Sequence, residues 1–234
     1  MKIAVFAYNF PHRKTNDFLF NLLFHKYDVK LVIAADPVKI DLPPSYLRSK
    51  LRYLNNYHPR DICLRFDIPY VVSPHNSKKT IALLNDNQIE LGIIAGARLL
   101  DQEVINAVSL GIINFHPGLL PKIRGLGALK KSIISGDPPG ITAHLIDRRM
   151  DAGRIIIKKT IPVYSDDTLM DLSHRQHDTQ LALLSETIDK LINNDIAEFP
   201  AIQNTLPHSP PTGKNEDDLV LKKFPKYIEK FCVK

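Results

Sequence analysis

The first half of the chain alternates short apolar runs with segments in which apolar residues recur every three or four positions. The runs are rich in β-branched and aromatic residues and are mostly apolar on both faces, a pattern typical of buried parallel strands. They predict strands at Ile3–Ala7, Val29–Ala34, Tyr70–Val72, Leu91–Ala95 and Ile112–Phe115. Strands that alternate with helices are typical of βαβ units, so we predict an α/β fold with a mostly parallel sheet and flanking helices.

Helical spacing lies between these runs, as in Phe18, Leu19, Leu22 and Leu23. Apolar residues at this spacing line one face of a helix and pack it on the sheet. The spacing predicts helices at Asn16–His25, Ser45–Asn56, Asp61–Phe66, Lys78–Asn85 and Gln102–Val108.

The pattern changes after Pro121. It predicts a helix at Ala128–Ser135, strands at Thr142–Asp147 and Arg154–Pro162, and a long helix from the Ser165–Asp167 cap to about Asn193. Further on, periodicity is lost and prolines stand at positions 200, 207, 210, 211 and 225. Prolines interrupt regular structure, so we expect residues 1–198 to form one domain and residues 199–234 a proline-containing tail lying over it.

Composition narrows the class of protein. A hydrophobic fraction of 44% and a charged fraction of 24% are those of an ordinary globular protein. The apolar run at residues 3–7 is too short for the core of a signal peptide. Cys63 and Cys232 have no paired spacing, so neither a disulfide framework nor a thiolate metal site is expected. We therefore expect a cytoplasmic protein without a membrane span or a metal.

The formal net charge is +6. This charge can be interpreted in two ways. It can be a general surplus that favours solubility, or it can attract a phosphorylated partner. Basic residues are spread along the chain and do not alternate with aromatic residues as in a nucleic-acid-binding stripe. The charge therefore indicates small anions as ligands, not nucleic acid. The sequence does not fix the oligomeric state, and a homodimer is compatible with it.

Polar residues follow three of the predicted strands directly. Asn9–Asn16 follows the first strand, Gly96–Arg98 follows the fourth, and Asn114 and His116 close the fifth. In an open α/β sheet, ligands bind beyond the carboxyl ends of the strands. These segments therefore predict a site at one edge of the sheet.

Asn114, His116 and Asp151 are the candidates for chemistry. Asn114 and His116 lie two residues apart, so both side chains leave the same face of a strand. An amide N–H can stabilise a developing oxyanion, and an imidazole with a pKa of about 6.5 can move protons. Asp151, in the turn with Ala152 and Gly153, could hold the charge of the imidazole and order a water. Taken singly, His116 also fits a packed structural histidine and Asp151 an ordinary turn residue.

Other clusters favour no chemistry. His174 and His177 are three residues apart on the predicted long helix, without an accompanying Glu or Cys pattern, and we interpret residues 174–177 as a solvated face. The chain has no Gly-x-Ser-x-Gly elbow, and neither cysteine has a histidine arrangement around it. Covalent nucleophilic catalysis is therefore disfavoured.

Three motifs together closely resemble the folate-dependent formyltransferase family. They are Asn114-x-His116-Pro117-Gly118-Leu119-Leu120-Pro121, Gly140-Ile141-Thr142-Ala143-His144-Leu145-Ile146-Asp147 and Asp151-Ala152-Gly153-Arg154-Ile155-Ile156. The family includes glycinamide ribonucleotide, methionyl-tRNA and sugar N-formyltransferases, and the resemblance runs from the first strand to about Asn193. It implies a Rossmann-like formyltransferase fold in residues 1–198 that transfers a formyl group from N10-formyltetrahydrofolate to an amine.

The resemblance also implies roles for individual residues. His116 would polarise the formyl group, Asn114 would hold the oxyanion, and Asp151 would tune His116 and position a water. Residues 95–100 and 146–150 resemble the segments that form the pterin pocket. The residues that would contact the folate are Arg98, Leu99, Leu100, Ile146, Asp147, Arg148 and Met150.

Departures from the family pattern bear on the amine acceptor. The segment after the first strand lacks the glycine-rich phosphate loop of glycinamide ribonucleotide transformylase, and Gly118 stands where that enzyme usually has serine. The tRNA enzymes carry a C-terminal β-barrel of roughly a hundred residues, and we expect only the proline-containing tail in its place here. His-Pro-Gly followed by Arg124-Gly125-Leu126 looks most like the sugar N-formyltransferases. The candidate acceptor-binding residues are Asn9, Phe10, His12, Arg13, Lys14, Gly118 and Arg124.

We therefore predict an enzyme that formylates a nucleotide-linked amino sugar for surface-glycan synthesis. Two alternatives stay open. One is a phosphoribosylglycinamide formyltransferase of purine biosynthesis with an unusual first loop. The other, from a different class, is a folate-binding protein without turnover, although such a protein would have no need of Asn114, His116 and Asp151 together.

Overall fold

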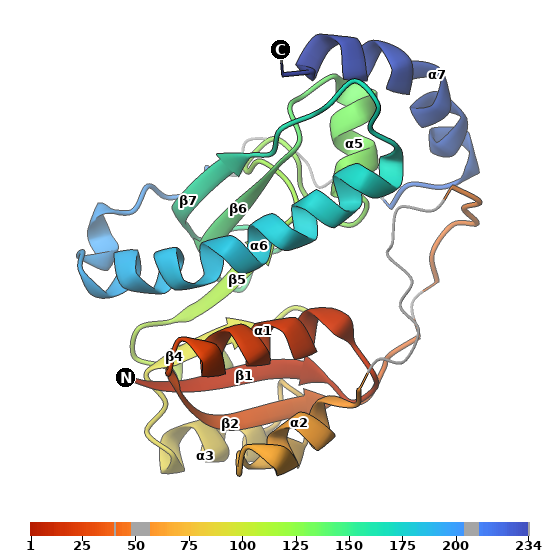
Figure 1. Ribbon diagram of the computed structural model, residues 1–234. Coiled ribbons are helices and arrows are strands. Elements are labelled where there is room, and N and C mark those ends of the chain that lie inside the picture. Colours follow the sequence, from red (N-terminus) through yellow and green to blue (C-terminus); the bar gives the residue numbers. More distant parts are fainter. Residues whose placement is uncertain (40, 48–56, 204–210, 234) are drawn as a thin grey trace.

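The computed structural model describes residues 1–39, 41–47, 57–203 and 211–233 (Figure 1). Its strands are β1 (Lys2–Tyr8), β2 (Asp28–Ala35), β3 (Tyr70–Val72), β4 (Leu91–Ile94), β5 (Ile112–His116), β6 (Gly140–Leu145) and β7 (Arg154–Thr160). Its α-helices are α1 (Arg13–Phe24), α2 (Pro59–Arg65), α3 (Lys78–Asp86), α4 (Gln102–Asn106), α5 (Ala128–Ser135), α6 (Leu169–Ile192) and α7 (Lys214–Phe231). A short 3-10 helix covers Ile196–Glu198.

The described strands form one seven-stranded sheet in the order β3-β2-β1-β4-β5-β6-β7. Strands β1 to β5 pair in parallel, and β6 and β7 add an antiparallel hairpin. The strand order reverses between β1 and β4, which is where open α/β sheets bind ligands. The prediction of an α/β fold with a mostly parallel sheet is confirmed.

Helices cover both faces of the sheet. One core cluster joins residues of α1, α2 and α6, among them Phe18, Leu19 and Leu184, to buried strand residues. A second cluster joins Leu84 of α3 and Val104 of α4 to the opposite face. Both faces of the central strands are therefore withdrawn from water, which explains why these strands are almost uniformly apolar in the sequence.

The predicted strand positions are confirmed to within two residues, but two helices depart from the prediction. α1 begins at Arg13 rather than Asn16, so Arg13 and Lys14 lie in the first helical turn and not in a loop. α6 begins after Thr168, whose side chain forms a capping box with Asp171, and not at the Ser165–Asp167 cap. The helix predicted for Ser45–Asn56 falls mainly outside the described residues.

α6 has two distinct sides. Its buried face carries Leu172, Leu183, Leu184, Ile188 and Leu191, and charged residues occur between these positions in the sequence of the helix.

Among the residues that the structure describes, no helix is long and apolar enough to cross a membrane.

Our prediction that the C-terminal segment lacks regular structure is wrong for Lys214–Phe231, which form α7. Its apolar residues Val220, Phe224, Tyr227, Ile228 and Phe231 follow helical spacing and pack against α5 in a third core cluster. Pro225 lies inside the helix and removes one backbone donor, a cost of about 3 kcal/mol that tertiary packing offsets. Helix α7 lies beside α5 (Figure 1).

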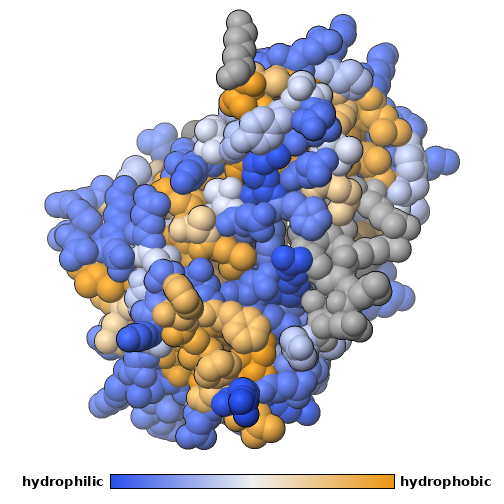
Figure 2. Space-filling view, viewed as in Figure 1, coloured by the Kyte–Doolittle hydropathy of each residue, from blue (hydrophilic) through white to orange (hydrophobic). Residues whose placement is uncertain are grey.

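An exposed apolar patch lies over α1 and α2, in the lower half of Figure 2. Phe20, Phe24, Leu64 and Phe66 are 43%, 82%, 83% and 49% exposed, and the rings of Phe20 and Phe66 meet edge to face at 6.4 Å. None of these four residues belongs to the predicted site.

Candidate active site

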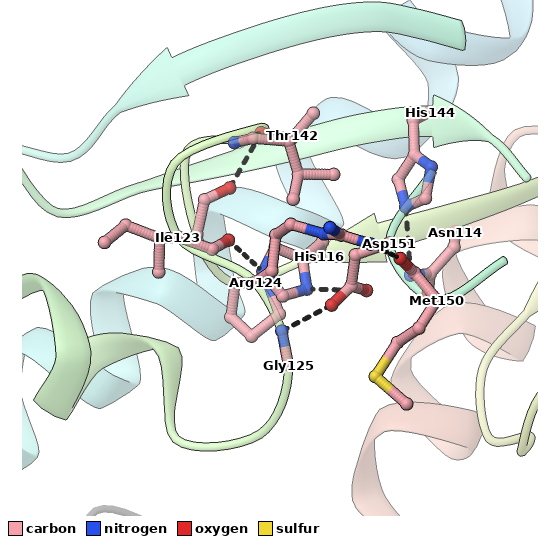
Figure 3. A network of polar contacts seen from close by, with 12 residues as sticks. Asn114, His116, Ile123, Arg124, Gly125, Thr142, His144, Met150 and Asp151 are labelled. Atoms are coloured by element: carbon pink, nitrogen blue, oxygen red, sulfur yellow. Dashed lines mark hydrogen bonds and ion pairs between the residues drawn. The ribbon is translucent and has the colours of Figure 1, made fainter. Parts of the chain in front are cut away.

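The end of β5 supplies two of the predicted catalytic residues. Asn114 lies opposite His144 of β6, and His116 lies opposite Thr142. The end of β5 therefore lies between the parallel strand β4 and the antiparallel strand β6. Side chains from β5, β6 and the turn after β6 therefore converge there (Figure 3).

The His116 ring is held on both sides. Its Nδ1 lies 3.3 Å from a carboxylate oxygen of Asp151, and its Nε2 lies 2.8 Å from the carbonyl oxygen of Ile123 (Figure 3). The residue is only 4% exposed. Both ring nitrogens therefore face acceptors, and a substrate carbonyl that takes a proton from Nε2 must displace Ile123 O.

The Asp151 turn is strained and tightly placed. Asp151 has a φ of +48°, a left-handed conformation that is uncommon outside glycine, and Gly153 has a φ of +109°. A Cβ at Gly153 would lie 1.9 Å from Leu145 O, so only glycine fits. Strain of this kind persists where the surrounding structure holds it and is common at functional sites.

The segment after Pro121 holds the Asp151 turn from the other side. The Gly125 backbone N–H donates to Asp151 Oδ2 at 2.5 Å, and the Arg124 guanidinium donates to Met150 O. Burial would raise the pKa of the Asp151 carboxyl, but the hydrogen bond and charge of His116 and the Gly125 N–H hold it well below its usual range. Asp151 is therefore an anion beside the imidazole.

Two functional residues escaped the sequence prediction, although both lie in its second motif. His144 is fully buried, with Nε2 3.2 Å from Asn114 Nδ2 and Nδ1 3.0 Å from Ala152 O. Thr142 donates to Gly118 O at 2.7 Å and accepts from Leu120 N at 3.0 Å. A polar residue at an inward position of a buried strand is the signal that could have identified each of them.

Gly118 leaves room for the imidazole. A Cβ there would lie 2.9 Å from His116 Nε2 and 2.8 Å from Ile123 Cγ2. Gly118 is itself buried. Its absent side chain therefore allows His116 to reach Ile123 O, and its predicted contact with the acceptor stays a prediction.

The predicted folate-contacting residues lie in two segments that share an apolar floor. Leu100 is 2% exposed and belongs to the same core cluster against which Ile146 packs. Arg98, Leu99 and Arg148 are exposed, and Asp147 pairs with Arg149. An open groove of about 600 Å³ is lined by Ile146 and Asp147 but not by Leu100 or Met150.

Most predicted acceptor-binding residues have partners within the protein. Asn9 donates to Asp36 at 2.7 Å and accepts from Tyr70 Oη at 2.9 Å, and Arg13 Nε donates to Asp17 at 2.8 Å. The Phe10 ring stacks on that of Tyr8 at 5.3 Å, with His12 edge-on to both. Their roles toward a substrate stay predictions.

Lys14 links this region to β5. Its Nζ donates to Phe115 O at 3.2 Å and lies 5.1 Å from the centre of the Phe18 ring. Phe115 stands between Asn114 and His116, so the Lys14 ammonium lies beneath the backbone of the site. Burial lowers the pKa of Lys14 to about 8.

We expect Lys14 to titrate near pH 8, which NMR of its ε-carbon would measure. An unfolded lysine has a pKa of about 10.4, so between about pH 8 and 10 the unfolded chain binds the proton and the folded chain does not. Stability therefore rises with pH through this window relative to Lys14→Met. A midpoint near 10 would contradict the lowered pKa of this ammonium.

Our interpretation of residues 174–177 as a solvated face is wrong for two of them. Gln176 and His177 are 5% and 8% exposed. Gln176 Nε2 donates to Pro117 O at 2.9 Å, and His177 Nε2 lies 2.7 Å from Asp17. Helix α6 therefore holds both the chain after His116 and helix α1, which a helical pattern alone does not reveal.

The fold and the site together define a class of protein. The members of this class are doubly wound α/β proteins in which an amide, an imidazole and a carboxylate lie together at the end of one strand. In addition, residues 69–188 match the model of the formyl transferase family. The chain belongs to this family.

Curated relatives share the sequence over part of their length. Methionyl-tRNA formyltransferase of Pelobacter propionicus is 28% identical over 165 residues, which cover 69% of this chain and 51% of the relative. The trifunctional purine biosynthetic protein adenosine-3 of Chironomus tentans is 35% identical over 102 residues, 42% of this chain and 7% of the relative. The matched region therefore spans about half or less of these relatives.

Solved structures share the fold. Phosphoribosylglycinamide formyltransferase of Bacillus halodurans has a TM-score of 0.64 at 23% identity and covers 83% of this chain and 96% of its own. A sugar N-formyltransferase of a Shewanella species has a TM-score of 0.62 at 20% identity and covers 94% of this chain and 86% of its own. At these identities, the likeness establishes the fold alone.

Proposed function

We propose that this protein is an N-formyltransferase that moves a formyl group from N10-formyltetrahydrofolate to the amine of a nucleotide-linked amino sugar. One observation carries the proposal: His116 lies 3.3 Å from the anionic Asp151, at the strand end that also presents Asn114. Membership of the formyl transferase family implies the formyl-folate co-substrate.

The residues have separate tasks in the proposed reaction. The amine nitrogen attacks the formyl carbon, the bond from that carbon to folate N10 breaks, and the proton lost by the amine goes to N10. Asn114 donates an N–H to the oxyanion that develops on the formyl oxygen. His116 moves the proton, and Asp151 stabilises the charged imidazole while that happens.

We place the pterin ring of the folate beside the segments of residues 95–100 and 146–150. Leu100 lies in one apolar cluster, and Ile146 packs against that cluster. An apolar slot with a few polar groups at its rim is typical of small-molecule sites. Exposed Arg98 and Arg148 stand at these segments and would attract the carboxylates of the folate tail.

Two observations support an amino sugar as acceptor. Residues 9–14 hold their polar groups in contacts within the protein and contain no glycine-rich loop for a phosphate. In addition, the likeness to the Shewanella sugar N-formyltransferase covers 94% of this chain and so includes part of the segment after Asn193. The likeness to the phosphoribosylglycinamide formyltransferase of Bacillus halodurans covers 83% of this chain.

The proposal is tested with a panel of acceptors at one concentration of formyl-folate. UDP-, GDP- and dTDP-linked amino sugars are compared with glycinamide ribonucleotide, and release of tetrahydrofolate is followed. We expect release that depends on one of the amino sugars. Release with glycinamide ribonucleotide alone would favour the purine-pathway alternative. Tight folate binding with no acceptor consumed would favour a binding protein.

A further inference from the structure

His144 connects two parts of the proposed site. It lies on β6 directly opposite Asn114 of β5 and is 1% exposed. Its Nε2 lies 3.2 Å from Asn114 Nδ2, and its Nδ1 lies 3.0 Å from Ala152 O. Figure 3 shows the ring standing above Asn114 on the neighbouring strand. One buried imidazole therefore contacts the amide and the residue that follows Asp151.

The partners determine which nitrogen of His144 carries the proton. A backbone carbonyl only accepts hydrogen bonds, so Nδ1 must be the protonated nitrogen that donates to Ala152 O. Burial, with a smaller contribution from the charge of His116, lowers the pKa of His144 to about 4. The ring is therefore neutral near pH 7, and its Nε2 carries a lone pair that accepts from Asn114 Nδ2.

This tautomer selects one orientation of the Asn114 amide. An asparagine side chain can present either its NH2 group or its carbonyl oxygen at a given position. The lone pair on Nε2 attracts an N–H and repels a carbonyl oxygen. Nδ2 therefore stays beside His144, and its second N–H is left to donate elsewhere.

We propose that His144 is a positioning residue that fixes the Asn114 amide so that an N–H of Nδ2 meets the formyl oxygen. The same ring donates a hydrogen bond to Ala152 O and so fixes the position of the Asp151 turn relative to β6. His144 touches no reacting atom and acts through its two neighbours. Its kinetic consequence rests on the proposed formyl transfer, whereas the orientation of the amide does not.

The kinetic test compares two substitutions with a double mutant. His144→Phe keeps the ring volume and removes both hydrogen bonds, and we expect kcat to fall about 10- to 100-fold with little change in either KM. His144→Gln can still accept from Asn114 and is expected to recover part of this loss. In an Asn114→Ala background, His144→Phe is expected to cost clearly less than in the wild type, because only the contact with Ala152 O is then left to lose.

Loss of the same factor in the wild-type and Asn114→Ala backgrounds would overturn the proposal, because His144 would then act elsewhere. A general weakening of the structure would also raise KM and would not be relieved by glutamine. These outcomes separate positioning from packing.

A second measurement needs no acceptor. In ¹⁵N NMR spectra of the wild-type protein at pH 7, we expect His144 to be neutral with the proton on Nδ1 and one side-chain N–H of Asn114 to be shifted by its hydrogen bond. A proton on Nε2 would overturn the proposal even if His144→Phe failed to fold. If this signature is present but no amine is formylated, the proposed function fails and the positioning of Asn114 stands.

Discussion

Replacing His116 by alanine is expected to lower kcat/KM for formyl transfer by about 1000-fold. General acid–base catalysis by a positioned side chain contributes about 10²- to 10⁴-fold, and the described neighbours offer no second imidazole that can take over. His144 is fully buried, is bonded on both nitrogens and has its pKa lowered to about 4. Initial rates of tetrahydrofolate release over a range of acceptor concentrations would measure the loss.

The control for this variant is another histidine. His25 is exposed at the end of α1, and its replacement by alanine is expected to leave turnover unchanged. Thermal denaturation would check that His116→Ala stays folded, since the substitution leaves Asp151 and Ile123 O without their ring partner. Full turnover by folded His116→Ala would remove His116 from the reaction.

The fold could be predicted from the sequence because its strands are buried on both faces. Runs rich in β-branched and aromatic residues, such as Ile3–Ala7 and Ile112–Phe115, have no competing helical pattern, so both the position and the type of these elements could be predicted. α7 could not be predicted in the same way. Pro225 and four earlier prolines indicate loop, and the helix depends on packing of Tyr227 and Ile228 against α5.

Part of the site could also be predicted, because some of its residues belong to one local sequence pattern. Asn114 and His116 share a strand face, and the local pattern therefore identifies them together. His144 is thirty residues away from Asn114, and only the antiparallel register of β5 and β6 brings the two side chains together. Lys14 was visible as a charge after β1, but its position beneath Phe115 depends on α1 beginning at Arg13.

The buried carboxylate of Asp217 anchors three segments. It is 0% exposed and accepts from Lys130 Nζ of α5 at 2.6 Å. It also accepts from Ser45 Oγ and from the backbone N–H groups of Tyr46 and Leu47, at 2.9 to 3.0 Å. Burial alone would raise the pKa of Asp217, but the hydrogen bonds, led by that of Lys130, lower it to about 2.

We expect Asp217→Ala to lower the free energy of unfolding by about 3–5 kcal/mol, because it leaves the Lys130 ammonium buried without its carboxylate. Urea denaturation at pH 7 would measure the loss. The pKa of Asp217 is lower in the folded state, so its contribution is present above about pH 4 and is lost as the pH falls toward 2. The stability difference between wild type and Asp217→Ala should shrink over that range.

Two control variants test whether the loss of stability comes from the buried carboxylate of Asp217. Asp218→Ala removes a neighbouring exposed carboxylate that contacts Tyr46, and is expected to cost less than about 1 kcal/mol. Lys130→Met combined with Asp217→Leu removes both charges and is expected to recover most of the loss, because a buried ion pair contributes little against apolar replacements of similar size. If Asp217→Ala costs no more than Asp218→Ala, the buried carboxylate does not hold α7 and residues 45–47 against α5.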